Sequence, residues 1–416
     1  MDYIRGFSDK KFGLLGEHLS HSFSPQIHKE LADYPYALYE VEKDSLGQWV
    51  KSNDLAGYNV TIPYKQEVMQ YLDELSPCAK SVGAVNTVVR RTDGTLFGDN
   101  TDYYGFAYML SKLGVDVSGK KALILGGGGA SKTVQAVLRE GGAEIVVVDL
   151  GLENNYDNIH LHFDSEIIVN ATPVGMYPKT GVSLVNLEDF KNCCGVCDVI
   201  YNPANTALLL QAQKLGIPSV NGLPMLVAQA KRAAEIFTNT ELSNDVIEKI
   251  RAQVEAQTMN IVLVGMPGSG KSTVGRIVAK ALGRELIDSD KEIKTFTGLS
   301  PSDIIKSQGE ADFRKVETTV LAEICKQSSL VIATGGGAVT IPDNKDILRQ
   351  NGVVIYIDRD IELLATDDRP LSVNLPALYE KRAPMYEDFA HKKVDGNTDV
   401  QTVAEKILAA FGEELR

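Results

Sequence analysis

Short apolar runs alternate with helix-favouring stretches along most of the 416-residue chain. Two of these runs, 122–125 (ALIL) and 260–264 (NIVLV), lead into glycine clusters that precede helix-like segments. Such alternation is typical of α/β domains with parallel sheets. Because the chain is too long for one ordinary core and 44% of its residues are apolar, we expect two or three well-packed domains.

The pattern predicts three regions. Residues 1–115 form a smaller substrate-binding lobe, with strands in KFGLLG, YALYEVE, GYNVTI and AVNTVVR. Residues 116–222 form a Rossmann-type lobe, and helical residues 223–257 return across the cleft and close this first unit. Residues 258–416 form a further α/β domain around the second glycine cluster. The junction is expected near Gln257.

The charge balance and the cysteines narrow the choice of partners. The formal net charge of −13 argues against nucleic-acid binding, which needs a basic face, but leaves anionic small molecules open. The five cysteines have no spacing typical of disulfide frameworks or closed zinc sites, so we expect reduced thiols. The sequence shows no signal peptide and no run of membrane-spanning length, which favours a cytoplasmic protein without a membrane partner.

The first glycine cluster has the pattern of a dinucleotide-binding turn. Gly126, Gly128 and Ser131 fit G-x-G-x-x-[G/A/S], which combines a tight turn with a helix N-terminus facing a pyrophosphate. The next apolar run ends in Asp149, where an acid can bind ribose hydroxyls. Either feature alone is common, but the two together predict dinucleotide binding. The expected contacts are Gly126, Gly127, Gly128, Gly129, Ala130, Ser131 and Asp149.

Polar residues of the first lobe indicate an acid–base pair. Ser22 and Ser24 stand two apart, so their hydroxyls face the same side of an extended segment. Lys65 closes the segment NVTIPYK, and Asp102 in GDNTD stands at the start of a predicted helix. A lysine and an aspartate that meet across a cleft can exchange a proton with a substrate hydroxyl during hydride transfer. Taken alone, each residue is more often a turn former, a cap or a solvated charge.

Seven motifs in order resemble those of shikimate dehydrogenases over nearly all of residues 10–257: HSFSP, NVTIPYK, AVNT, GDNTD, GGGGAS, NATPVGM and NGLPMLVAQA. The resemblance implies that the first unit reduces 3-dehydroshikimate with NADPH. It implies that Lys65 and Asp102 are the catalytic pair, with Lys65 as the proton donor. It also implicates Ser22 and Ser24 at the substrate carboxylate, Thr61, Asn86 and Gln229 at the ring hydroxyls, and Tyr201 and Gly222 near the nicotinamide and substrate.

The segment after Asp149 departs from that family. NADP-dependent members carry an arginine-containing cluster here, whereas Asp149 is followed by Leu150 and Gly151, with no lysine or arginine nearby. A carboxylate repels a 2′-phosphate and accepts a hydrogen bond from a 2′-hydroxyl, which favours NAD(H) over the NADP(H) of the family. Only GLENNYDNIHLHF separates Asp149 from the next apolar run, too little for the usual helix and loop. Loss of efficient cofactor binding is therefore a third alternative.

The second glycine cluster, GMPGSGKS (265–272), matches G-x-x-x-x-G-K-[ST] between a strand-like and a helix-like run. In such a loop, backbone N–H groups hold phosphates, Lys271 reaches the β and γ oxygens of ATP, and Ser272 ligates Mg²⁺. This context disfavours a glycine-rich turn without function. The expected nucleotide contacts are Gly268, Ser269, Gly270, Lys271, Ser272 and Thr273.

Residues after this loop indicate the phosphate acceptor. The segment DSD (288–290) offers one carboxylate to Mg²⁺ and another to an acceptor hydroxyl. Arg314 and Glu317 stand one helical turn apart, which suits an arginine that is held by a carboxylate while it binds a carboxylated ligand. Taken alone, these two residues are better explained as an ordinary surface ion pair. The bare backbone of GGG (335–337) permits close approach by a ligand.

This order of motifs resembles shikimate kinases over residues 259–411. The resemblance implies that the catalytic residues are Lys271, Asp290 and the lid arginine Arg369, and that Asp288 holds Mg²⁺ through water. Arg382 follows Arg369 by only thirteen positions (382 − 369), and the preceding LLATDD is acidic, so we expect a short lid and weaker nucleotide binding. The implied shikimate contacts are Asp290, Arg314, Gly336, Gly337 and Arg382, with the two arginines at its carboxylate.

Together the resemblances predict an α/β fusion enzyme that makes shikimate and then phosphorylates its 3-hydroxyl. One alternative is a quinate-type dehydrogenase joined to another small-metabolite kinase, although Arg314 and Arg382 favour a carboxylated acceptor. In another, the dehydrogenase half persists only as a binding or stabilising module, against which the presence of Lys65 and Asp102 argues. The sequence indicates neither an oligomeric state nor a channel between the halves.

Overall fold

The computed structural model describes residues 10–19, 22–365 and 375–415. Three sheets in this part of the chain confirm the predicted α/β class with parallel strands. The chain divides into two compact units: residues 1–174, 183–201 and 211–251 form the first, and residues 175–182, 202–210 and 252–416 form the second. The predicted domain boundary between residues 257 and 258 stays a prediction.

A six-stranded mixed sheet forms the lobe that the sequence predicts to bind the substrate. Its strands, in spatial order, are β2 (Tyr36–Glu40), β1 (Phe12–Gly16), β3 (Gly57–Val60), β5 (Thr87–Arg90), β6 (Leu96–Asp99) and β4 (Glu74–Leu75). β1 runs parallel to β2 and β3, whereas β5 is antiparallel to β3 and β6. The β5–β6 hairpin turns at Gly94, whose φ of +87° glycine adopts without strain.

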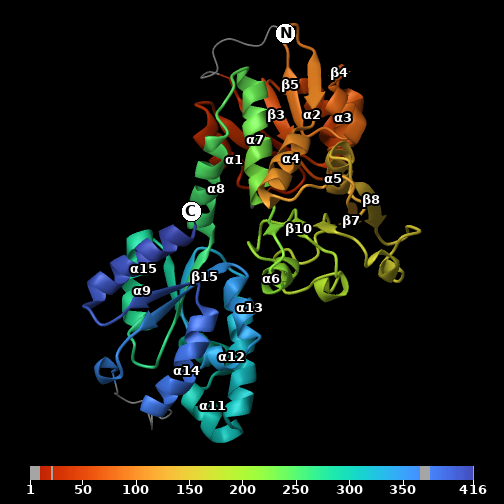
Figure 1. Cartoon of the computed structure of the whole chain (residues 1–416). Coiled ribbons are helices and arrows are strands. Elements are labelled where there is room, and N and C mark those ends of the chain that lie inside the picture. The colour runs from red at the N-terminus through yellow and green to blue at the C-terminus, as the bar shows by residue number, and fades with distance from the viewer. Residues whose placement is uncertain (1–9, 20–21, 366–374, 416) are drawn as a thin grey trace. The chain divides into compact units, whose positions relative to one another are not determined.

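Helices cover both faces of this sheet (Figure 1). α2 (Leu46–Ser52) and α3 (Pro77–Val82) share a buried cluster with the strands that includes Leu46, Val50 and Tyr58. Facing the opposite way, Gly57 on β3 lies against the Phe237 ring of α7 (Leu223–Thr238), which packs beside α1 (Ser24–Leu31). A side chain at residue 57 would overlap that ring. α7 therefore packs on this first sheet although it follows the strands of the second sheet in sequence.

The second sheet of this unit is fully parallel. Its strands, in order, are β11 (Ser219–Val220), β10 (Gly195–Asp198), β9 (Ile167–Asn170), β7 (Lys121–Leu125) and β8 (Glu144–Val148). α4 (Thr101–Leu113) and α5 (Gly129–Glu140) pack on it through a cluster around Phe106, Ile124 and Val134. Strand order reverses at β7, and open α/β sheets bind ligands at the carboxyl edge of such a point. The first glycine cluster lies there.

β8 and β9 are joined without an α-helix. Residues 149–166 contain only the 3₁₀ turn η3 (Ile159–His162). Asparagine side chains stabilise the loop instead: Asn155 accepts a hydrogen bond from the Asp157 N–H group, and Asn158 donates one to the Glu153 carbonyl. The segment is as short as the sequence predicted.

The second unit contains a five-stranded parallel sheet. Its strands, in order, are β13 (Glu285–Asp288), β14 (Leu330–Ala333), β12 (Asn260–Val264), β15 (Gly352–Asp358) and β16 (Lys392–Asp395). Apolar clusters on the two sides of this sheet bury most of its central residues. One face is covered by α9 (Lys271–Leu282) and α15 (Val400–Glu414), and the other by α12 (Glu310–Cys325), α13 (Asn344–Arg349) and α14 (Leu375–Phe389) (Figure 1).

The remaining elements are short or connect these layers. α10 (Ser289–Thr297) and α11 (Pro301–Gln308) follow β13 and pack against α12. The other elements of the described chain are α6 (Ala207–Lys214), α8 (Asp245–Thr258), η1 (Lys43–Ser45), η2 (Glu67–Tyr71), η4 (Leu187–Asp189), η5 (Ala338–Thr340) and η6 (Ile361–Leu363). Within the described residues, no helix has the length and apolar character needed to cross a bilayer.

Candidate active sites

Lys65 and Asp102 meet in the first unit. Lys65 lies in the turn after β3, and Asp102 lies in the first turn of α4, where the Asn100 side chain caps the helix by accepting a bond from Tyr103 N–H. Lys65 Nζ lies 2.6 Å from Asp102 Oδ2, with the two side chains 28% and 13% exposed. The lysine is therefore held in place, yet it remains accessible to a substrate.

Asn86 joins these elements to α7. Its side-chain oxygen accepts a hydrogen bond from the Thr101 backbone N–H at 2.7 Å. Its amide nitrogen donates to the Gln229 side-chain oxygen at 3.4 Å. Thr101 is buried and also contacts Thr87 through its hydroxyl. The structure thus brings the predicted residues Asn86 and Gln229 together. Asn86 also bonds to Thr101, the residue that precedes Asp102.

The two predicted serines lie at the start of α1. Ser22 Oγ accepts a hydrogen bond from the Ser24 N–H group, and Ser24 is the first residue of the helix. Between them, Phe23 meets the Tyr201 ring edge-on, with 6.0 Å between centroids. Thr61 follows β3 directly, is partly exposed, and donates its backbone N–H to the Leu15 carbonyl. These residues all follow the carboxyl ends of strands or begin helices.

Gly222 precedes α7 at a place where no side chain fits. A Cβ there would overlap the Val199 carbonyl group. Gly105 on α4 makes a similar approach to α7, because a Cβ on it would lie 2.7 Å from the Met225 carbonyl oxygen. Gly105 therefore allows α7, and with it Gln229, to pack closely on α4, whereas Gly222 allows the start of α7 to lie against the backbone that follows β10.

A buried aromatic and polar cluster supports this region. His28 Nδ1 and the Tyr34 hydroxyl are 2.6 Å apart, and the His28 ring stacks on Tyr36 with centroids 4.0 Å apart. Tyr36 donates to Asn59 Oδ1 at 2.8 Å, and Asn59 in turn donates to Thr87. Burial lowers the pKa of His28 to about 3, so this imidazole is neutral at ordinary pH. The cluster fixes α1 and β3 beneath the site.

The first glycine turn bonds directly to the acid at the end of β8. Gly126 has a φ of +101°, and the Gly127 N–H group donates to Asp149 Oδ2 at 2.7 Å. Gly128 caps α5, and Gly129 and Ala130 are exposed at its start. Ser131, by contrast, is fully buried and accepts a bond from Gln135, so its hydroxyl serves the helix.

The surroundings of Asp149 are acidic or neutral. Tyr156 lies near it: burial and the Asp149 charge both raise the pKa of this phenol. Residues 150–163 contain Glu153 and Asp157 but no lysine or arginine. Asp164 and Glu166 lie at the opposite edge of the sheet, where they pair with Lys121 and Lys120. The end of β8 therefore presents a negative charge to the outer part of the turn.

The phosphate loop of the second unit runs from β12 to α9. Lys271 Nζ donates to the carbonyl oxygens of Gly265 and Met266 at 2.8 and 2.9 Å, so it lies across the loop. Ser272 donates to Asp288 Oδ2 at 2.6 Å. Asp288 also caps α10 by accepting the Asp290 N–H group. Gly268 and Gly270 have left-handed φ angles, Ser269 is buried, and Thr273 is exposed.

The two arginines predicted to bind the phosphate acceptor, Arg314 and Arg382, are held by different partners. Arg314 Nη1 lies 2.6 Å from Glu317 Oε2, and Glu317 is fully buried. Burial raises the pKa of the Glu317 carboxyl, although Arg314 opposes that shift. Arg382 donates to the Gly336 carbonyl at 3.2 Å. A Cβ on Gly337 would overlap the Arg314 guanidinium, so the bare backbone is what lets this arginine lie there.

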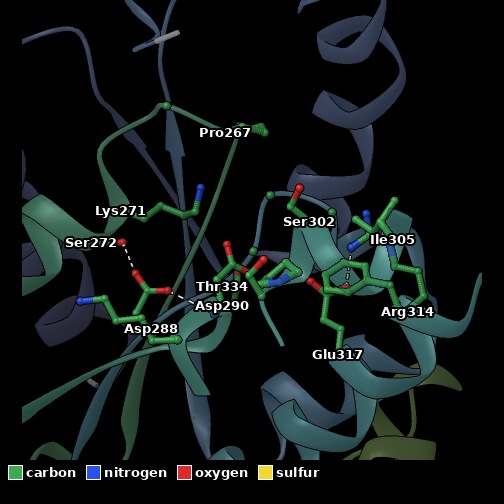
Figure 2. A pocket seen from close by; sticks show the side chains of 18 of the residues that line it. Pro267, Lys271, Ser272, Asp288, Asp290, Ser302, Ile305, Arg314, Glu317 and Thr334 are labelled. Atoms are coloured by element: carbon green, nitrogen blue, oxygen red, sulfur yellow. Dashed lines mark hydrogen bonds and ion pairs between the residues drawn. The ribbon is translucent and has the colours of Figure 1, made fainter. Parts of the chain in front are cut away.

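One cavity of about 510 Å³ contains both ends (Figure 2). Lys271 and Ser272 line one end, and Arg314 and Arg382 line the other. Figure 2 shows Asp290 between the phosphate-loop residues and Arg314. The cavity can therefore accommodate a phosphate donor and an anionic acceptor side by side. Its lining also includes Gly268, Gly270, Thr273, Asp288, Gly336 and Gly337.

Arg369, the predicted lid residue, lies outside the described residues. Two supporting residues were missed from the sequence. Tyr386 donates to the Gly336 carbonyl at 2.5 Å from one helical turn beyond Arg382, a spacing that KRAPMY contains. Thr101 stands next to Asp102 in GDNTD, but nothing in the pattern marks it as buried.

Comparisons with known proteins identify related families for both parts of the chain. The model for the shikimate dehydrogenase substrate-binding domain matches residues 14–88, and the shikimate kinase model matches residues 267–411. The NADP(+) shikimate dehydrogenase of Clostridium beijerinckii is 40% identical over 254 residues, which cover 56% of this chain and 93% of that one.

Two solved structures are similar over the same region. A chorismate mutase/shikimate 5-dehydrogenase fusion protein from Clostridium acetobutylicum is 37% identical with a TM-score of 0.57, covering 59% of this chain and 97% of that one. Shikimate 5-dehydrogenase from Listeria monocytogenes, in complex with shikimate and NAD, is 33% identical with a TM-score of 0.53, covering 58% and 96%. The chain therefore belongs to the shikimate dehydrogenase family in its N-terminal part and carries a shikimate kinase domain behind it, which makes it a bifunctional enzyme of the shikimate pathway.

Proposed function

We propose that the first unit reduces 3-dehydroshikimate to shikimate at the Lys65–Asp102 pair. The dinucleotide supplies a hydride to the substrate carbonyl carbon. Lys65 gives its proton to the carbonyl oxygen, so that C=O becomes CH–OH. The 2.6 Å ion pair supports this role, because Asp102 orients the ammonium group and keeps it beside the substrate. In the reverse direction, Lys65 takes the proton from the hydroxyl.

The remaining polar residues of this lobe orient the ring acid. Ser22 and Ser24, at the start of α1, bind its carboxylate. Thr61, Asn86 and Gln229 bind its hydroxyls. Asn86 suits this role because its oxygen is fixed by Thr101, so the direction of its amide nitrogen is set before substrate arrives.

We propose that this site uses a nicotinamide dinucleotide with an unusual preference for NAD(H). The relatives named above include an NADP(+) enzyme and one solved with NAD, so similarity supports both. Asp149 fits a ribose 2′-hydroxyl and opposes a 2′-phosphate. Gly126 to Ala130 face the pyrophosphate, with Tyr201 and Gly222 on the nicotinamide side. Ser131 supports the helix.

The second unit transfers the γ-phosphoryl group of ATP to the 3-hydroxyl of shikimate. Lys271 and the N–H groups of residues 268–273 hold the phosphates. Arg314 and Arg382 bind the shikimate carboxylate, with Gly336 and Gly337 close to the ring. Asp290 takes the proton of the attacking hydroxyl. Arg369 stays a prediction for the lid.

We propose Mg²⁺ as the metal of this site. Ser272 and Asp288 provide a hydroxyl and a carboxylate 2.6 Å apart, the oxygen ligands that Mg²⁺ prefers. When bound, it neutralises charge on the phosphates.

The cavity that contains both the phosphate loop and the arginine pair carries this proposal. The test is to incubate purified protein with shikimate and NAD⁺, NADP⁺ or ATP, measuring the absorbance of reduced nicotinamide and the phosphorylated product. We expect nicotinamide reduction with at least one dinucleotide and phosphorylation with ATP. Phosphorylation without nicotinamide reduction would support a degenerate dehydrogenase half instead. A cytoplasmic location stays a prediction.

A further inference from the structure

Arg359 follows β15 and lies beside the phosphate loop. β15 pairs with β12 in parallel, so residues that follow these strands share one edge of the sheet. Arg359 Nη1 lies 3.7 Å from the position that a Cβ on Gly270 would occupy. The Arg359 Cβ atom lies 3.4 Å from the corresponding position on Gly396. Arg359 therefore stands between the phosphate loop and the turn after β16.

The Arg359 guanidinium has no hydrogen-bond or ion-pair partner among residues 10–19, 22–365 and 375–415. Its Nε atom is buried and unpaired. The adjacent acid, Asp358, is already occupied, because its carboxylate accepts bonds from Tyr356 and Tyr379 and pairs with Lys393 at 2.9 Å. A buried donor without an acceptor costs free energy that a bound anion would recover.

The same feature marks the two arginines of the acceptor end. Arg314 and Arg382 also have buried, unpaired Nε atoms within the part of the chain that the structure describes. Both line the cavity to which the shikimate carboxylate is assigned above. In this unit, an incompletely satisfied buried guanidinium therefore accompanies a proposed anion site, and Arg359 has the same character beside a loop that binds phosphates.

Strand order indicates which end of the nucleotide Arg359 faces. Asp288 ends β13 and Gly335 follows β14, so the acceptor lies on one side of β12. Arg359 follows β15, on the other side of β12. A nucleotide whose γ-phosphate points toward the acceptor has its α-phosphate and nucleoside on the Arg359 side.

We propose that Arg359 binds the α-phosphate of the nucleotide in the kinase half. Its guanidinium donates charge-assisted hydrogen bonds to the phosphate oxygens from the side opposite the magnesium ligands. It is a binding residue for ATP and ADP alike, since both carry this phosphate. The inference rests on the proposed nucleotide site at the phosphate loop.

Calorimetric titration of the full chain with ADP tests the assignment without turnover. Arg359→Ala should weaken ADP binding about tenfold or more, as expected for loss of a charge-assisted bond. Arg359→Lys keeps the charge and should retain most of the affinity. Lys280→Ala is the matched control. It removes a cation from the last turn of α9, the helix that begins at Lys271, about 13 Å along the helix axis from that residue. Thermal unfolding without nucleotide checks that each variant folds.

The outcomes separate this inference from the proposed function. If Arg359→Ala binds ADP as tightly as the unaltered protein, Arg359 is not a nucleotide ligand. If Arg359→Ala weakens the binding of adenosine as much as that of ADP, the contact is with the nucleoside and the phosphate assignment is wrong. Failure of the unaltered chain to bind ADP at all would instead remove the proposed kinase site.

Discussion

The two glycine-rich turns of this chain follow similar parallel strands but have opposite charges beside them. The turn after β7 bonds through Gly127 to the carboxylate of Asp149. The loop after β12 carries Lys271 within it and has Arg359 beside Gly270. Both offer backbone N–H groups at the start of a helix, which is what a phosphate needs. The flanking side chains therefore make the difference.

This difference separates phosphate binding from the choice of nucleotide, which a glycine motif alone does not distinguish. Glycines and a helix N-terminus determine that a phosphate group binds. An acid at the next strand end recognises ribose hydroxyls, whereas cations recognise the more highly charged chain of ATP. If this division is correct, changes at the flanks should alter which nucleotide binds, while changes in a turn should alter whether the turn forms.

The largest expected effects come from removing one lysine in each half. Lys271→Ala should lower phosphorylation about 10³-fold by removing a preorganised cation from the transferring phosphates. Lys65→Ala should lower shikimate oxidation by about 10³-fold through loss of the proton-transfer group. Each variant should keep the activity of the other half within about twofold, since the two phosphate-binding turns are separate. Steady-state assays of both reactions on both variants measure this.

A variant that loses both activities would contradict that independence. Circular dichroism should first show that the variant is folded. Lys11→Ala is a control for charge removal, because its ion pair with Asp54 is exposed on both sides. It should change neither reaction.

Replacing one glycine of each turn by alanine should show which glycine the turn needs in order to form. Gly268 has a φ of +87°, and a Cβ there would overlap the backbone of Ala365, so Gly268→Ala should destabilise the kinase half by about 2 kcal/mol or more. Gly128 has a φ of −73° and open space around its Cβ position, so Gly128→Ala should be nearly neutral for stability. Calorimetric unfolding distinguishes the halves, because ADP raises the transition of the half that binds it. Equal effects of the two substitutions would contradict the steric argument.

Acid should destabilise the substrate-binding lobe through His28. Burial lowers its folded pKa to about 3, so the unfolded chain binds the extra proton below pH 6.5 and stability, full above that pH, falls toward pH 3. Between pH 7 and pH 5 the loss should be about 2 kcal/mol. Urea unfolding followed by the fluorescence of Trp49, the single tryptophan, reports on this lobe. His28→Gln should flatten the pH dependence, and an unchanged slope would show that other groups cause it.

The kinase half provides a parallel case. Burial lowers the pKa of His391 to about 4, and its Nδ1 atom accepts the Val354 N–H group. Stability again falls with falling pH, because the unfolded chain binds the extra proton, and it is lost from pH 6.5 toward pH 4. His28→Gln should leave this part of the acid response unchanged.

Much of the fold, and the positions of several candidate residues on it, were predictable because their signals are local. Strand, turn and helix follow one another within a few residues at Gly126 and at Lys271, and spacing alone places Arg314 and Glu317 on one helix face. The missing helix after Asp149 was visible as a shortage of residues.

What the sequence did not reveal depends on distant contacts. The Tyr36–Asn59 and Asn59–Thr87 bonds join segments far apart in the chain. Ser131 fitted the dinucleotide pattern, but packing of α5 buries it and turns its hydroxyl to Gln135. Arg359 has no motif, because its position depends on the pairing of β12 with β15.

The smallest expected effect is also the most direct test of the flanking charge. Asp149→Asn keeps an acceptor for the ribose and for the Gly127 N–H group but removes the negative charge. The NADP(H)/NAD(H) ratio of binding constants should rise about tenfold, because the variant no longer repels a 2′-phosphate. Calorimetric titration with each dinucleotide measures both binding constants. Glu153→Gln is the matched control, because Glu153 is an exposed acid in the same loop. An unchanged ratio in Asp149→Asn would mean that the 2′-phosphate lies away from the end of β8. The charges beside the two turns would then differ without determining which nucleotide each turn binds.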